Sequence, residues 1–252
     1  MNTNTNTAQT DSLESMIIKD IVVQNFKAAN IMEKYGIDFC CKGKRPLNEA
    51  LAEKKINPKL FIEELNSTIE NSQSVDEKFE KWDLTFLANY IVNNHHTYLR
   101  ESIPTIIAHL EKINSKHGKK YPYLQNVLNE FGILAEELVS HMQKEEKILF
   151  PIIRYLEDSK RFNEKPKTGG YGTIRGPINK MEQEHSSAGN GLENIRVLTN
   201  NFSLPEDACT TFRIAFQELE YFEKDLHKHV HLENNILFPK AIKLEEELLL
   251  IK

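Results

Sequence analysis

Apolar residues recur at helical spacing along the first part of this chain. In residues 16–35 they fall every three to five positions, which places them on one face of an α-helix, and Gly36 is predicted to end that helix. The apolar residues of this face are Ile17, Ile21, Phe26, Ala29 and Met32. Two shorter stretches, 46–52 and 58–69, each have a proline near the first turn, where a helix tolerates it. The pattern predicts a small helical domain at 16–75.

Four longer helical patterns follow a polar linker at 71–80. The first begins near Trp82 and contains Pro104, which predicts a kink or a break in that helix. The other three patterns cover 123–156, 178–200 and the chain from 205 to its C-terminus. Long helical stretches joined by turns, without alternating strand patterns, are typical of an up-and-down bundle. We therefore predict an all-α protein with a four-helix bundle at 80–250.

Composition narrows the class of protein and its compartment. Of the 252 residues, 40% are apolar and 27% are charged, with a net charge of −5, so neither a nucleic-acid surface nor a basic membrane patch is expected. No apolar run reaches the roughly 18 residues of a membrane span. Residues 1–15 are rich in Asn and Thr and lack the features of a signal peptide, which predicts a disordered lead-in. The three cysteines are too few for a secreted disulfide framework, so we expect a cytoplasmic protein.

One pattern, His-x-x-x-Glu-x-x-Ile-Leu-Phe-Pro, occurs twice in the predicted bundle. It begins at His141 and again at His229, 88 positions later. On the preceding helix of each copy stands another histidine: His96 lies 45 residues before His141, and His185 lies 44 before His229. The bundle is therefore predicted to consist of two helix pairs with matching polar positions.

The spacing of this repeat predicts a buried metal centre. Residues four apart lie on one helix face, so Glu145 and Glu233 point the same way as the histidines that open each motif. The apolar Ile-Leu-Phe that follows belongs inside the bundle, and buried carboxylates and imidazoles are costly unless something neutralises them. Four imidazoles and two carboxylates suit two first-row ions, and iron better than magnesium or calcium. A mononuclear zinc site is the alternative, but tetrahedral zinc would use fewer than six ligands.

Bridging glutamates would leave such a centre open to small ligands. If Glu145 and Glu233 both bridge two non-haem iron ions that also share an oxo or hydroxo bridge, each ion is five-coordinate and keeps one open position. The other histidines are predicted to be surface or hydrogen-bonded residues. These are His109, His117, His227 and His231.

Several assignments stay open at the level of sequence. His95 and His96 are adjacent and point about 100° apart on a helix, so only one should be a ligand, and the spacing favours His96. Glu146 and Glu184 each neighbour a candidate ligand, and either an iron exit path or simple surface solvation would explain them.

The adjacent Cys40 and Cys41 offer a second candidate site. A disulfide between neighbours is strained, so we expect free thiols that bind iron transiently, meet a partner's cluster or change redox state. The alternative is two semi-buried cysteines that end a helix. Cys209 is expected to be a plain buried or semi-buried residue.

Three segments resemble the repair-of-iron-centres family of di-iron proteins, whose bundle is haemerythrin-like. They are the double-cysteine segment 35–43 (YGIDFCCKG), the two repeat motifs, and 181–185 (MEQEH). The resemblance covers nearly all of 16–245, and it implies six metal ligands: His96, His141, Glu145, His185, His229 and Glu233. The stretch 96–104 aligns with the family's first-helix motif and supports His96 over His95.

The resemblance also implies a function. It points to a bacterial stress-response protein that restores iron–sulfur clusters damaged by nitric oxide or peroxide, with the damaged iron–sulfur proteins as partners. This is the role of an iron donor rather than an enzyme. Reduction of nitric oxide and binding or sensing of dioxygen at the same centre are the alternatives. A homodimer that packs or exchanges its N-terminal domains is compatible with the sequence.

Overall fold

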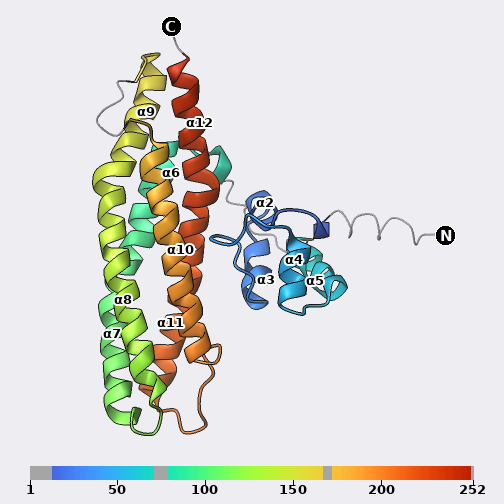
Figure 1. Ribbon diagram of the computed structural model, residues 1–252, viewed down its shortest axis with the longest axis vertical. Helices are drawn as coiled ribbons and strands as arrows, with labels where there is room; N and C mark the ends of the chain where they lie inside the picture. Colours follow the sequence, from blue (N-terminus) through green and yellow to red (C-terminus); the bar gives the residue numbers. More distant parts are fainter. Residues whose placement is uncertain (1–12, 71–78, 167–171, 251–252) are drawn as a thin grey trace, which may run out of the picture. The chain divides into compact units, whose positions relative to one another are not determined.

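The computed structural model describes residues 13–70, 79–166 and 172–250 (Figure 1). Most of the predicted linker at 71–80 and most of the predicted lead-in lie outside these residues, and the part of the lead-in that is described, 13–15, forms a helical turn rather than disordered chain. The chain divides into two compact units, Met1–Trp82 with Val230–Ile236, and Asp83–His229 with Leu237–Lys252. The domain limits expected at 16–75 and 80–250 stay a prediction. Among the described residues, no helix combines the length and the apolar character needed to cross a membrane.

The N-terminal unit is built from short helices around a small apolar core. The helices are α2 (Ile18–Gln24), α3 (Ala28–Lys34), α4 (Leu47–Glu53) and α5 (Pro58–Glu70), followed by the 3-10 turn η1 (Phe79–Lys81). Fully buried side chains include Ile18, Met32, Leu47, Leu51 and Phe61. The expectation of short helical elements near 46–52 and 58–69 agrees with α4 and α5.

The single helix expected over 16–35 is wrong. Asn25 has extended backbone angles (φ −150°, ψ 105°) and separates α2 from α3. Its side-chain Oδ1 accepts a hydrogen bond from the backbone N of Lys27 at 3.0 Å. Asparagine side chains compete in this way with the helical backbone, so the apolar periodicity continues while the helix does not. Gly36, with φ +65°, follows the end of α3 as expected.

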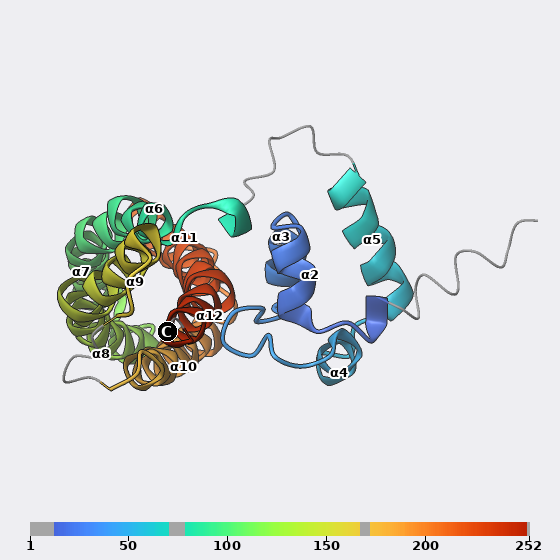
Figure 2. The same cartoon turned by 90° about the horizontal axis from the view of Figure 1, so that it is seen from above.

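The described residues from 84 to 249 form an up-and-down bundle of four rods. The first rod is α6 (Leu84–Ile91), η2 (Val92–His96) and α7 (Thr97–His117); the second is α8 (Tyr123–Lys144), η3 (Glu145–Leu149) and α9 (Phe150–Phe162). The third is α10 (Arg175–Leu198), and the fourth is α11 (Thr210–Leu232), η4 (Glu233–Leu237) and α12 (Phe238–Leu249). Figures 1 and 2 show the rods running lengthwise beside one another, and α8 packs against both α7 and α10. The expected all-α bundle is confirmed.

Pro104 does not break its helix. It lies inside α7, which continues through it to His117. The first rod instead changes its helical winding upstream, at η2, where no proline stands. The predicted break at Pro104 is therefore wrong.

Three rods contain a π-helical turn, and each of these turns includes a candidate metal ligand. His96 is the last residue of η2, whereas Glu145 and Glu233 are the first residues of η3 and η4. A π turn holds one residue more than the α-helix would, which rotates the following residues about the helix axis. In η3 and η4 the turn ends just before the Phe-Pro of each motif, where a proline lacks the N–H that a regular α-helix would use. Such turns are frequent at functional sites, and apolar periodicity did not predict them.

Candidate metal centre

The structure gathers the six repeated residues into two overlapping groups in the bundle. One group is His96, Glu145, His229 and Glu233, and the other is His141, Glu145, His185 and Glu233. In each group, one candidate ligand atom per residue lies within 4.8 Å of the others. All six side chains are buried, at no more than 2% exposure. Both glutamates belong to both groups, which is the arrangement expected of two neighbouring ions that share carboxylates.

The imidazoles face one another through their Nε2 atoms. The Nε2 atoms of His141 and His185 are 3.0 Å apart, and those of His96 and His229 are 3.3 Å apart. Glu145 Oε2 lies 3.3 Å from Nε2 of His96 and 3.3 Å from Nε2 of His141, one histidine from each group. The centre of the bundle is thus lined by imidazole nitrogens and carboxylate oxygens, the donor atoms that iron accepts.

The phenylalanine of each motif packs on one of these imidazoles. Phe150 stacks on His96 with ring centroids 5.8 Å apart, and Phe238 stacks on His185 with centroids 6.1 Å apart. Each copy of the motif therefore supplies a candidate carboxylate ligand and an apolar wall for the histidine of the preceding helix. This explains why histidine, glutamate and phenylalanine recur together in the sequence.

The donor set fits metal ions. Two neutral imidazole nitrogens at 3.0 Å can share one proton, but two protonated ones would repel each other. Two buried carboxylates are costly to ionise in a medium of low polarity unless positive charge balances them. One divalent cation held by each group would take the lone pairs of the facing imidazole nitrogens and would balance the charge of the carboxylates.

Two of the imidazoles are held from outside by carboxylates. Nδ1 of His96 donates to Glu146 Oε1 at 2.7 Å, and Nδ1 of His141 donates to Glu184 Oε2 at 3.0 Å. Because an ionised carboxylate only accepts hydrogen bonds, each of these imidazoles carries a proton on Nδ1 and can direct the lone pair of Nε2 inward. The structure therefore gives Glu146 and Glu184 a specific partner, which sequence reasoning missed. Their role on an exit path stays a prediction.

Each of these outer carboxylates is also paired with a cation. Glu146 Oε1 accepts from Arg100 Nη2 at 2.6 Å, and Glu184 Oε1 accepts from Lys144 Nζ at 2.6 Å. Partial burial raises the pKa of both carboxyl groups, but the hydrogen bonds from histidine and from the cation outweigh it, so each pKa lies below its usual value. Both side chains are therefore ionised at neutral pH.

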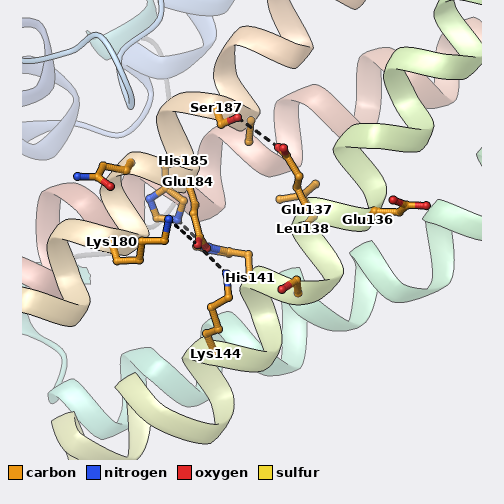
Figure 3. A pocket seen from close by; sticks show the side chains of 12 residues that line it. Glu136, Glu137, Leu138, His141, Lys144, Lys180, Glu184, His185 and Ser187 are labelled. Carbon is orange, nitrogen blue, oxygen red and sulfur yellow. Dashed lines mark hydrogen bonds and ion pairs between the residues drawn. The ribbon is translucent and has the colours of Figure 1, made fainter. Parts of the chain in front are cut away.

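A pocket of about 460 Å³ opens beside one group (Figure 3). His141 and His185 line it, together with Lys144, Lys180 and Glu184. Figure 3 shows the carboxylate of Glu184 beside His141, within reach of both Lys144 and Lys180. Two candidate ligands thus contribute to the wall of a pocket, although each is at most 2% exposed.

The two adjacent histidines in the first rod of the bundle, His95 and His96, have different partners in the structure. Both are buried, yet His96 belongs to a candidate metal group, whereas Nδ1 of His95 pairs with Asp225 Oδ1 at 3.0 Å. The ring of His95 stacks on that of His229 at 5.7 Å, with 7° between the ring planes. His95 thus supports a candidate ligand rather than adding another.

This difference gives a first test. We expect His96→Gln to lose at least one of about two irons per chain, because Nε2 of His96 is one of the four convergent nitrogens. His95→Gln should keep both. Colorimetric iron analysis after anaerobic reconstitution measures the two variants side by side. A loss in His95→Gln together with full iron in His96→Gln would reverse the assignment.

The other histidines do not join the two groups. His109 donates from Nδ1 to Glu218 Oε2 at 2.7 Å, and Nε2 of His117 lies 3.2 Å from Cys209 Sγ. Burial lowers the pKa of His231 to about 3, so this imidazole is neutral. Cys209 is half-buried and free.

Cys40 and Cys41 form a compact turn with Asp38 in the N-terminal unit. Asp38 Oδ1 accepts from the backbone N of Cys40 at 3.0 Å and of Cys41 at 2.9 Å. Neither cysteine forms a disulfide, and one oxygen or sulfur atom from each of the three residues lies within 4.8 Å of the others. Cys40 is buried, which raises the pKa of its thiol well above the usual value, whereas Cys41 is half-buried. The predicted transient binding of iron by this pair stays a prediction.

Two protein-family models match the chain. Residues 87–241 match the hemerythrin HHE cation binding domain, and residues 14–69 match ScdA_N, described as a domain of unknown function (DUF542). The first match contains all six candidate ligands, and the second contains Cys40 and Cys41.

Curated relatives match the chain over nearly its whole length. The iron-sulfur cluster repair protein YtfE of Yersinia pseudotuberculosis serotype IB (strain PB1/+) is 35% identical over 222 residues, which is 87% of this chain and 93% of the relative. YtfE of Yersinia pestis (strain Pestoides F) has the same identity and coverage. With two domains in this order and this extent of similarity, the chain belongs to the YtfE family of hemerythrin-type cation-binding proteins.

Proposed function

We propose that this protein repairs damaged iron–sulfur clusters in other proteins by means of a di-iron centre in its bundle. The observation that carries the proposal is the pair of four-residue groups that share Glu145 and Glu233. The names of the relatives support the choice of clusters as the target. Damage by nitric oxide or by oxidants is the condition under which we expect the activity, and the cytoplasm is where we expect it.

The ligand set would hold two irons in similar surroundings. His96 and His229 would bind one ion, His141 and His185 the other, and Glu145 and Glu233 would bridge them. When bound, the ions supply iron and redox equivalents for rebuilding a cluster. The residues of this chain bury the centre, orient the imidazoles and set how firmly each ion is held.

Donation of iron suits a carboxylate-bridged site better than a site closed by histidine alone. A carboxylate shared by two ions would hold each of them less firmly than a ligand bound to one ion alone, and the pocket lined by His141 and His185 lies beside one of the two groups. The same pocket would admit nitric oxide or dioxygen as small ligands. The names of the relatives favour repair over nitric-oxide reduction or oxygen carriage as the main role.

The test is transfer of labelled iron. The protein is loaded with ⁵⁷Fe without air and incubated with a hydro-lyase whose [4Fe–4S] cluster has been damaged by nitric oxide or peroxide. We expect the client to regain activity and ⁵⁷Fe to appear in its cluster by Mössbauer spectroscopy. The proposal fails if free ferrous ion at the same concentration reactivates the client equally well and the label stays on this protein.

The same preparation separates the enzymatic alternative. With an electron donor and nitric oxide, a reductase would release many equivalents of nitrous oxide per chain. We expect at most about one turnover, because the centre is proposed to give up iron rather than to cycle. Sustained turnover would favour nitric-oxide reduction.

A further inference from the structure

We propose that Glu146 and Glu184 are positioning residues, each of which controls how firmly one particular iron of the pair is held. This inference rests on the di-iron centre proposed above. It concerns side chains outside the six candidate ligands. It means that the strength with which each iron is bound is set by a different side chain.

The two carboxylates are divided evenly between the two groups. Glu146 bonds His96, a member of the group with His229, and Glu184 bonds His141, a member of the group with His185. One imidazole in each group therefore donates its Nδ1 proton to an ionised carboxylate. A carboxylate on Nδ1 fixes the tautomer and the ring orientation, and it makes Nε2 a stronger electron donor to the metal.

The internal repeat shows that these carboxylates are not copies of one another. Glu146 follows the candidate ligand Glu145, and the matching position in the second half, after Glu233, is Asn234. Glu184 precedes His185, and the matching position before His96 is His95. Each half of the bundle thus supplies one carboxylate from a different place in the motif, and the even division arises only in the folded bundle.

The outer cations complete the arrangement. Arg100 holds Glu146, and Lys144 holds Glu184, with Lys180 at 3.6 Å as a second cation. Glu146 and Glu184 are mostly buried, with side-chain exposures of 27% and 18%. Each carboxylate is thereby fixed in orientation between a surface cation and a buried imidazole. The cation partly neutralises the carboxylate, so the carboxylate polarises the imidazole less than it would alone. The imidazole then binds iron less firmly, which suits a centre that must release iron.

The test uses Glu146→Gln and Glu184→Gln. Glutamine keeps an oxygen that can accept from Nδ1 but removes the charge. The matched control is Glu218→Gln, because Glu218 accepts from Nδ1 of His109 at the same 2.7 Å, away from both groups. Each protein is loaded with ⁵⁷Fe, and release to a ferrous chelator is followed with time and by Mössbauer spectroscopy.

We expect each single variant to release one iron per chain about 10–100-fold faster than wild type, while the other iron leaves at the wild-type rate. One of the two Mössbauer quadrupole doublets should change in Glu146→Gln and the other in Glu184→Gln. The control should release both irons as wild type does. Metal-free variants should melt within about 2 °C of the metal-free wild type, since the hydrogen bond is kept.

The inference is overturned if both irons leave the variants at the wild-type rate. It is also overturned if one variant accelerates the release of both irons equally. A purely structural role would lower the melting temperature of the metal-free variants and leave the doublets unchanged, and that also counts against it. If wild type itself holds fewer than about two irons after reconstitution, the di-iron centre fails first. The two failures are therefore distinguishable.

Discussion

Glu145→Ala is expected to lower bound iron from about two ions per chain to fewer than one. Glu145 is shared by both candidate groups, and its Oε2 lies 3.3 Å from an imidazole nitrogen of each. Its removal takes a ligand from both ions and leaves their positive charges less balanced in a buried site. Iron analysis after anaerobic reconstitution measures the loss, and transfer of ⁵⁷Fe to a damaged cluster should fall with it.

The comparison variants make this result specific. Glu233→Ala should behave alike, because Glu233 is the other shared carboxylate. Glu220→Gln is the control: the side chain of Glu220 is 45% exposed, and its ion pair with Lys224 is of the weak surface kind. If Glu145→Ala still binds about two irons per chain and its Mössbauer spectrum is unchanged, Glu145 does not bridge the two irons.

Removal of the metal is expected to lower the thermal midpoint of the bundle by roughly 8–16 °C. Bound ions stabilise the folded state by about 4 kcal/mol when the free metal is a thousandfold above its dissociation constant. For a domain of this size, each kcal/mol corresponds to about 2–4 °C. In addition, the metal-free protein must bury two carboxylates beside four imidazoles at no more than 2% exposure. Circular dichroism melts of the iron-loaded and chelator-treated protein measure the difference.

A double variant separates ligand binding from burial cost. Metal-free Glu145→Gln/Glu233→Gln should melt higher than the metal-free wild type, because burying a neutral amide costs less than burying a charge. Iron should no longer raise its midpoint. Equal midpoints for loaded and metal-free wild type would contradict the claim that the metal balances the buried charges.

Local spacing made much of this protein predictable. An apolar residue every three or four positions marks a helix face wherever the helix lies, so the helical class and the four rods followed from the pattern. The repeat likewise pointed to His141, Glu145, His229 and Glu233, because a histidine and a glutamate four apart share a face in an α-helix. The similar distances before each motif added His96 and His185. The structure gathers those six residues. The local signal failed at Asn25, where a single side chain redirects the backbone without altering the apolar period.

The spacing of residues in the sequence did not predict contacts between segments that are far apart along the chain. The bond from Glu146 to His96 joins residues 50 positions apart, and the bond from Glu184 to His141 spans 43. The sequence favoured His96 over His95, but the pairing of His95 with Asp225 joins residues 130 positions apart. Helical spacing, which the chain encodes over a few residues, therefore determined the fold class and the candidate ligands. Only the packing of the rods decided which imidazole meets which carboxylate, because those pairs exist only once segments far apart in sequence are brought together.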